Sequence, residues 1–188
     1  MLSIKITVPE RLNDATRRLM ERAQTNPDAM EAAGNAAEMV LRAHFARLNT
    51  KPNKRGFHKT NFWNQIENAT SMTEYSGNSA TVTIADARFP AKVDGAIITP
   101  KTAKALAIPL TDQAYGKRPS EWDKKILHLI PRRNRPSILA TIGGSGEITP
   151  HYVLLKKARV PADPDALPAA EKLWEGILRE VETNFTAI

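Results

Sequence analysis

The chain has 188 residues, of which 41% are hydrophobic and 25% charged, a globular composition that excludes wholesale disorder. It contains no cysteine, which excludes disulfides, thiolate metal sites and cysteine nucleophiles. The net charge of +7 is unevenly spread: residues 1–60 carry +5 and residues 88–135 carry +7, whereas residues 61–87 carry −3 and residues 136–188 carry −2.

The N-terminal residues predict a strand followed by a helix. Apolar and polar residues alternate from Leu2 to Val8, which is typical of a half-buried strand. A capping box over residues 7–10 begins a helix whose apolar positions extend to Ala23. The same opening residues lack the continuous apolar stretch of a signal peptide, and nowhere do 18 apolar residues run together. We therefore expect a protein that is made in the cytoplasm and has no membrane partner.

A second helix is predicted directly afterwards. Asn26 can cap it, Pro27 occupies its first position, and Asn49 and Pro52 end it. Its apolar residues recur at spacings of three and four, the clearest periodicity in the chain: Met30, Ala33, Ala37, Val40, Leu41, Phe45 and Leu48.

Residues 50–76 lose this periodicity, and we expect a basic and aromatic loop region there. Residues 51–56 are basic and rich in turn formers, and the aromatic residues Phe57, Phe62 and Trp63 follow. The next strand is predicted at residues 81–84, which are mostly β-branched.

Residues 88–136 are predicted to form an extended arm or insertion. Six prolines oppose regular helix and central strand in this stretch, which is also too long for an ordinary loop. The apolar run 103–110 is too hydrophobic for a solvated loop, so we expect it to pack on a neighbouring subunit. The alternative is that this run is another strand of the subunit's own sheet.

The C-terminal third predicts a hairpin and a closing helix. Strands at 138–142 and 151–157 flank a glycine-rich turn at 143–146. The last helix has a one-sided apolar face made of Ala170, Leu173, Trp174, Ile177, Leu178, Val181 and Phe185. The expected fold is a single α+β domain over residues 1–188, with a small antiparallel sheet packed by two N-terminal helices and one C-terminal helix.

No constellation of residues predicts catalysis. The four histidines have no partner at metal-ligand spacing, the turn at 143–146 lacks the lysine and hydroxyl residue of a phosphate-binding loop, and Ser145 lacks the spacing of a nucleophile elbow. We expect no enzymatic activity, no cofactor and no metal site.

The basic stretches are the strongest candidates for binding. Basic residues interleaved with aromatics can hold phosphates and stack bases without reading a sequence, and a pI near 9.8 favours contact with nucleic acid or an acidic protein surface. The other interpretation is a solvated loop whose aromatics are anchored in a partner or in the core. The candidate contacts to phosphate or an acidic partner are Lys54, Arg55, Arg132, Arg133 and Arg135. The candidate subunit or partner contacts are Phe57, Phe62, Trp63, Leu106, Ile108, Tyr115 and Trp122.

An ordered set of short motifs over roughly residues 35–165 resembles the phage virion morphogenesis family of Mu-like bacteriophages. The motifs are His44-Phe-Ala-Arg-Leu48, Lys51-Pro-Asn-Lys-Arg-Gly56, Thr60-Asn-Phe-Trp63, Gly95-Ala-Ile-Ile-Thr-Pro-Lys101 running into 103–110, Ala114-Tyr-Gly-Lys-Arg-Pro119, and Tyr152-Val-Leu-Leu-Lys-Lys-Ala-Arg-Val-Pro161. One departure is Val93-Asp-Gly95, where the family pattern has a His and a Gly-Gly pair.

The resemblance implies a non-enzymatic virion component for tail completion or head-to-tail joining, located in the tail or neck. It implies a homo-oligomeric ring whose further partners are other neck, tail-tube or head-connector proteins. A ring around a DNA channel would bring the basic residues near packaged DNA without sequence specificity. The alternative function is that of a sequence-independent nucleic-acid-binding protein.

Overall fold

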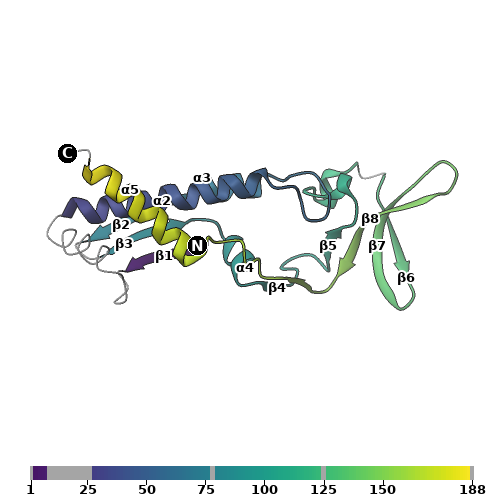
Figure 1. Ribbon diagram of the computed structural model, residues 1–188. Coiled ribbons are helices and arrows are strands. Elements are labelled where there is room, and N and C mark those ends of the chain that lie inside the picture. The colour runs from purple at the N-terminus through teal and green to yellow at the C-terminus, as the bar shows by residue number, and fades with distance from the viewer. Residues whose placement is uncertain (1, 8–26, 77–78, 124–125, 187–188) are drawn as a thin grey trace. The chain divides into compact units, whose positions relative to one another are not determined.

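The chain divides into two compact units (Figure 1). The computed structural model describes residues 2–7, 27–76, 79–123 and 126–186, so the helix predicted between residues 9 and 25 lies outside the described residues. Unit 1 comprises residues 1–51, 61–94 and 162–188, and unit 2 comprises residues 52–60 and 95–161. The α+β class is confirmed. The sequence predicted one domain with one small sheet, whereas the described strands form three sheets.

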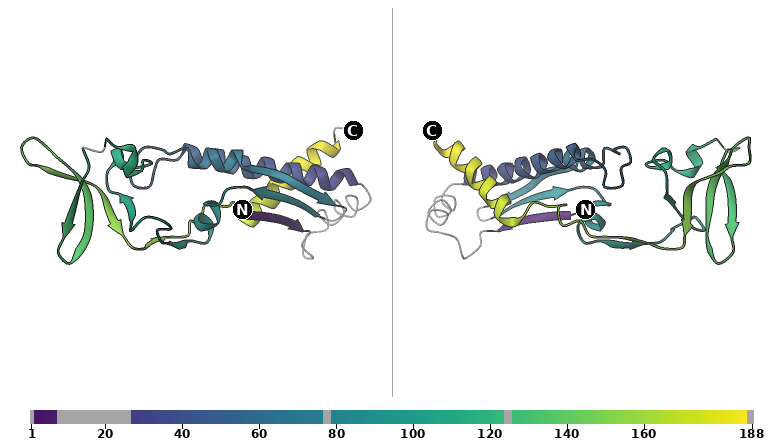
Figure 2. Two further views of the ribbon diagram at one scale, coloured as in Figure 1. Left: turned by 180° about the vertical axis from the view of Figure 1, so that it is seen from behind. Right: turned by 45° about the vertical axis from the view of Figure 1, so that its right-hand side comes forward.

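Unit 1 is an antiparallel sheet packed by helices. The strands β1 (Leu2–Thr7), β2 (Thr70–Ser76) and β3 (Ser79–Ile84) have the order β1-β3-β2. Figures 1 and 2 show the long helix α2 (Pro27–Thr50) running along this sheet, with α5 (Ala170–Thr186) packed beside α2. Two short helices complete the unit, α3 (Phe62–Asn68) and α4 (Phe89–Val93).

The apolar stripe predicted for α2 forms the centre of this unit. Leu41 and Phe45 are fully buried against Val82 and Ile84 of β3. Ile177 of α5 is buried in the same cluster, and Leu173 and Trp174 pack against it. The helices α2 and α5 therefore pack together in the core of unit 1. Burial of each large apolar side chain contributes about 1.5–3 kcal/mol.

Two glycines allow this close packing. A Cβ atom on Gly176 of α5 would lie 2.7 Å from Cγ2 of Val40, and one on Gly34 of α2 would lie 3.0 Å from Cβ of Ala80 on β3. Glycine costs a helix about 1 kcal/mol relative to alanine. The absence of a side chain at these two points lets α5 approach α2, and α2 approach the sheet.

The loop region predicted over 50–76 ends at residue 61, because α3 and β2 follow. The helix α3 is too short to show an apolar period: it begins after Asn61, whose φ is 52°, and buries only Ile66. In β2, a bulge between Met72 and Glu74 breaks the alternation, and Thr70 is its only buried residue. Neither element therefore has the pattern on which a sequence prediction depends.

Unit 2 is built on an antiparallel sheet of four strands with the order β5-β8-β7-β6. The strands are β5 (Leu106–Pro109), β6 (His128–Arg132), β7 (Arg135–Ile142) and β8 (Ile148–Leu155). The predicted hairpin around residues 143–146 is confirmed as β7–β8. A second, two-stranded sheet pairs β4 (Ala96–Ile98) with β9 (Ala158–Val160). The helical turns are η1 (Asp112–Ala114) and η2 (Pro119–Glu121).

Residues 88–136, predicted to form an extended arm or insertion, are not an irregular arm, since they contain α4, β4, β5, η1, η2 and β6. From residue 95 onward they belong to unit 2, which interrupts unit 1 in the sequence. The alternative interpretation of 103–110 holds: Leu106 pairs with Leu155 and Ile108 with Val153, so β5 is a strand of the subunit's own sheet. Pro109 and Pro131 are compatible with strands because they lie in β5 and β6, the two edge strands, where a missing N–H need not break a ladder hydrogen bond. Pro136 lies in the interior strand β7, where it is the second residue.

Candidate functional site

The predicted contact residues Phe62 and Trp63 lie on the core of unit 1. Both are half-buried, and the Trp63 ring stacks on Phe45 with centroids 6.1 Å apart. The Arg88 guanidinium lies over the Phe62 ring, 5.2 Å from its centroid. Phe62 and Trp63 therefore anchor α3 in the core of unit 1. This agrees with the alternative interpretation of the sequence, in which the aromatic residues are anchored in a partner or in the core.

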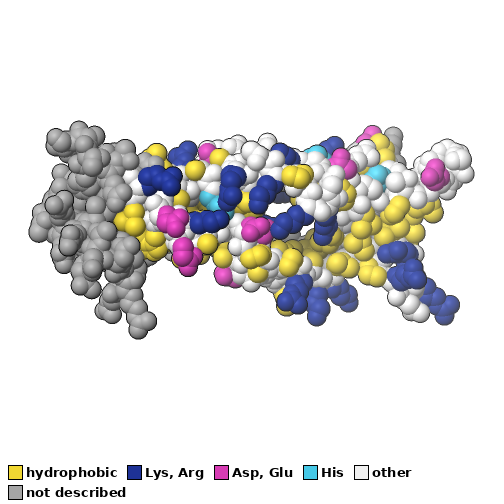
Figure 3. Space-filling view, viewed as in Figure 1, with side chains coloured by type: hydrophobic (Ala, Val, Ile, Leu, Met, Phe, Trp, Pro, Cys, Tyr) yellow, Lys and Arg dark blue, Asp and Glu magenta, His cyan; other side chains and the backbone are white. Residues whose placement is uncertain are grey.

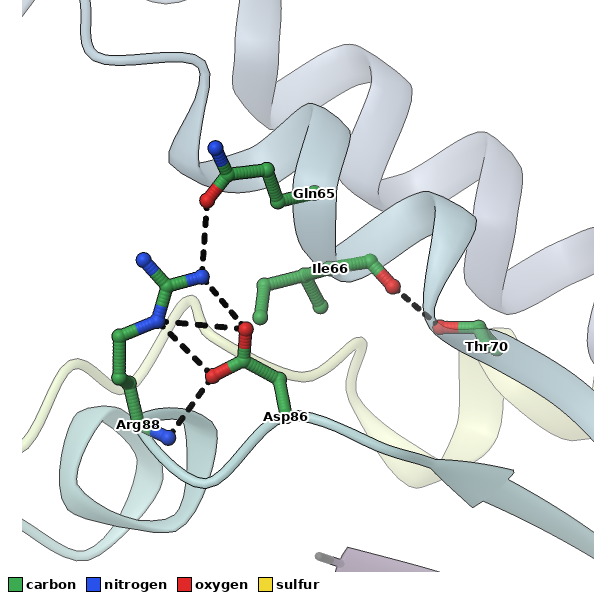
Figure 4. Close-up of polar contacts among 5 residues, drawn as sticks. All are labelled: Gln65, Ile66, Thr70, Asp86 and Arg88. Carbon is green, nitrogen blue, oxygen red and sulfur yellow. Dashed lines mark hydrogen bonds and ion pairs between the residues drawn. The ribbon is translucent and has the colours of Figure 1, made fainter.

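A hydrogen-bonded network joins α3 to the start of α4 (Figure 4). The Asp86 carboxylate accepts hydrogen bonds from the backbone N–H and the Nε–H of Arg88, at 2.8 and 3.0 Å. The Arg88 Nη2 group also donates to Oε1 of Gln65 at 2.8 Å. The side-chain hydrogen bond from Arg88 lowers the pKa of Asp86. Every group in this network is used to hold elements together, so it is structural.

In unit 2, the structure brings the predicted residues Phe57 and Tyr115 together. Their ring centroids are 5.2 Å apart. His58 is held by Asp112, whose Oδ1 accepts hydrogen bonds from the His58 backbone N–H at 2.5 Å and lies 2.9 Å from Nδ1. These hydrogen bonds lower the pKa of Asp112. Residues 52–60 are thus attached to η1 and belong to unit 2.

The centre of unit 2 is a polar cluster on β8 that the sequence analysis did not predict. The Trp122 Nε1–H donates to Oη of the buried Tyr152 at 2.8 Å, and this hydroxyl donates to the carbonyl of Lys117 at 3.1 Å. His151 is buried between the hydroxyls of Thr111 and Thr141, at 2.9 and 3.1 Å. The histidine that begins the predicted strand 151–157, directly before four apolar or aromatic residues, is a signal that could have located this cluster, because buried polar groups are hydrogen-bonded.

This cluster does not have the geometry of a catalytic site. Both ring nitrogens of His151 face threonine hydroxyls, and burial lowers the pKa of His151, so the ring is neutral near pH 7. Burial also raises the pKa of the Tyr152 phenol. Among the described residues, no carboxylate hydrogen-bonds to the imidazole and no three His, Asp or Glu side chains are grouped so that they could hold a metal ion. The cluster can position the segment from η1 to Trp122 on the sheet.

The other two predicted contacts, Leu106 and Ile108, belong to an apolar face of the four-stranded sheet. Residues directly opposite each other on neighbouring strands share a face, so the row formed by Ile108, Val153, Ile138 and Ile130 crosses all four strands on one side. Ile142 and Ile148 oppose each other beside the turn of the β7–β8 hairpin on this same side.

We call the residues in these rows the apolar face. The centre of the apolar face is buried, since Ile138 is 7% exposed. The end of this face beside the β7–β8 turn is open to solvent, since Ile142 and Ile148 are 49% and 51% exposed. Figure 3 shows hydrophobic side chains gathered over these strands. Among the described residues of unit 2, the helical elements are limited to the single turns η1 and η2, so no long helix of this unit lies on the sheet.

The basic candidates all lie in unit 2 and are exposed. Lys54 and Arg55 are in the segment 52–60, and Arg132, Arg133 and Arg135 surround the turn between β6 and β7. Asn134 makes this turn with a φ of 61°, and the Arg132 Nε–H donates to the carbonyl of Pro136 at 2.8 Å. The structure therefore brings the three arginines together.

No protein-family model, curated protein or solved structure matches the chain. In the described part of the chain, no helix has the length and apolarity required to cross a membrane.

Proposed function

We propose that this chain is a non-enzymatic structural virion protein, a tail-completion or head-to-tail joining component that assembles as a homo-oligomeric ring. The observation that carries the proposal is the apolar face of unit 2, which ends in the exposed pair Ile142 and Ile148. The ordered motifs between residues 35 and 165 supply the family resemblance.

An apolar surface of this kind favours self-association. Large exposed apolar patches on a folded unit mark interaction surfaces, because their burial removes apolar area from water. The β7–β8 hairpin presents Ile142 and Ile148 side by side next to the turn at 143–146, as a projecting contact would. The occupant that we assign to this face is a second copy of the chain, since a ring needs a heterologous contact that repeats from one subunit to the next.

The buried polar groups support a structural role rather than an enzymatic one. His44, His151 and Tyr152 each make hydrogen bonds that connect separate segments of one unit. A general acid or base needs a free position for substrate, and these side chains already use their polar atoms within the fold.

The proposal is tested by the mass and shape of the purified protein. Light scattering after gel filtration should give the mass of a defined oligomer, and negative-stain electron microscopy should show that this oligomer is a closed ring. Ile142→Asp should reduce the mass toward that of the monomer while the circular dichroism spectrum remains that of the parent. The matched control is Met39→Asp, because Met39 is similarly exposed, at 58%, but lies on α2 of unit 1.

A chain that remains monomeric at all concentrations, or an Ile142→Asp variant that assembles like the parent, would contradict the assignment of this surface. The virion role is tested separately by deleting the gene from its phage or prophage. Particles should then accumulate as separate heads and tails. Normal joined particles in its absence would refute the proposed role.

A further inference from the structure

The two units differ in charge far more than segments of the sequence suggest. Unit 2 contains 15 Lys and Arg against 4 Asp and Glu, a balance of +11, whereas unit 1 contains 12 against 16, a balance of −4. The positive charge balance of unit 2, +11, is therefore larger than that of the whole chain, +7, although unit 2 contains fewer than half of the chain's residues. A field of one sign over a small unit is typical of a surface that binds a polyanion.

The described basic side chains of unit 2 lie at its surface. Every described Lys and Arg of this unit is exposed. Two of its four acidic residues already serve the fold, since Asp112 binds His58 and Glu121 accepts the backbone N–H of Arg118 at 3.1 Å. Within the described residues, neither Arg132, Arg133 nor Arg135 forms an ion pair. Figure 3 shows dark blue side chains gathered at the free end of β6 and β7.

The β6–β7 turn has an arrangement that an anion would stabilise. Arg132 and Arg135 are directly opposed partners in the ladder, with Arg133 between them in the chain. Like charges in directly opposed positions of an antiparallel pair destabilise it. A phosphate group between the guanidinium groups would remove this repulsion and accept several charge-assisted hydrogen bonds.

The aromatic residues indicate which nucleic acid fits. Proteins that hold single strands use exposed aromatic rings as platforms for bases. In unit 2, Phe57, Tyr115, Trp122 and Tyr152 pack on one another or on histidines and are buried or half-buried. Since these rings are not exposed as platforms for bases, the remaining contacts are those to the phosphates, which do not depend on the base sequence of the nucleic acid.

We infer that unit 2 is a binding module for the phosphate backbone of double-stranded nucleic acid, with the arginines of the β6–β7 turn as its principal contact. This inference does not rest on the proposed virion function, since the binding is a property of the isolated chain. Unit 1 is not expected to contribute to this binding.

The test is the affinity of the full chain for short duplexes of unrelated sequence, measured by fluorescence anisotropy between 50 and 200 mM salt. The duplexes should bind alike, and binding should weaken steeply as salt rises. The variant Arg133→Glu/Arg135→Glu should bind about tenfold or more weakly at the lower salt concentration, and its slope of log affinity against log salt should be smaller by about 2. The matched control is Arg42→Glu/Lys172→Glu, which makes the same change in net charge on exposed or half-buried helix positions of unit 1.

Four results would overturn the inference. They are no binding at low salt, an equal loss in both double variants, tighter binding to single strands than to duplexes, and equally tight binding of polyglutamate, which would identify an acidic protein as the partner. Thermal melts check that each variant is folded. If the reversed pair melts early, Arg133→Gln/Arg135→Gln is measured instead, and it should reproduce the smaller salt slope.

Discussion

His44 connects two distant segments of unit 1 through one neutral imidazole. The Arg47 Nη2 group lies 3.1 Å from its Nδ1, which therefore accepts, and its Nε2–H donates to the Asp165 carbonyl at 3.0 Å. Burial is the main reason that the pKa of His44 is lowered, and the charges of Arg47 and Lys51 act in the same direction, against the effects of Asp165. This contact fixes the segment before α5 on α2.

The lowered pKa predicts a loss of stability in acid. Well above pH 6.5, the ordinary pKa of histidine, the imidazole is neutral in both states, so its contacts stabilise the fold fully. As the pH falls below that value, the unfolded chain binds the proton first and unfolding becomes more favourable. The melting temperature should therefore fall more between pH 7.5 and 5.5 for the parent than for His44→Gln. Equal falls would show that this histidine does not titrate as described.

Tyr152 gives a second prediction at this scale. Tyr152→Phe removes the acceptor of the Trp122 N–H and the donor to the Lys117 carbonyl. Leaving a partly buried donor unsatisfied costs about 1–3 kcal/mol, which denaturant unfolding followed by tryptophan fluorescence can measure. The control is Tyr115→Phe, because within the described chain the Tyr115 side chain makes ring contacts but no hydrogen bond. An unchanged midpoint for Tyr152→Phe would mean that water replaces the lost partner.

The close packing of α5 on α2 predicts an effect of Gly176→Ala on stability that is opposite to the effect expected from helix propensity. Alanine normally stabilises a helix by about 1 kcal/mol relative to glycine. Gly176→Ala should instead destabilise the protein, because the new Cβ would lie 2.7 Å from Cγ2 of Val40. The double variant Gly176→Ala/Val40→Ala should recover part of the loss, which a thermodynamic cycle would measure. A higher melting temperature for Gly176→Ala alone would exclude the close approach.

The elements that could be predicted are those with a sustained pattern. The helix α2 could be predicted because Ala37, Leu41 and Phe45 continue one stripe, and the β7–β8 hairpin because two short apolar runs flank a glycine-rich turn. The strands β5 and β6 were missed because each is short, contains a proline and lies at a sheet edge. Their stability comes from pairing with β8 and β7, which a local pattern does not contain.

The candidate site was predicted in its residues but not in its contacts. The three arginines of the β6–β7 turn lie within four consecutive residues of the sequence, so their clustering was evident. His58 and Asp112 are 54 positions apart, and Trp122 and Tyr152 are 30 apart. Such pairs are set by the topology of the sheet. The charge difference between the units was also hidden, because unit 2 combines residues 52–60 with residues 95–161.

At the scale of the whole molecule, the excess charge of unit 2 predicts how salt acts on stability. Like charges crowded on one small folded unit repel each other, and added salt screens this repulsion within about 10 Å at 0.1 M. The melting temperature should rise as sodium chloride increases from 50 to 200 mM. Arg133→Glu/Arg135→Glu should show a smaller rise, because it lowers the charge of unit 2. A decrease for the parent would indicate that attractive pairs dominate.

The division of the chain has a consequence for its synthesis on the ribosome. All strands of unit 2 lie within one continuous stretch, residues 95–161, whereas unit 1 needs α5 from beyond that stretch to complete its core. Contacts between residues close in sequence form quickly, and chains fold as they emerge. We therefore expect unit 2 to complete its folding before unit 1, although unit 2 begins later in the chain. Until α5 has left the exit tunnel, α2 and its sheet have one apolar surface uncovered.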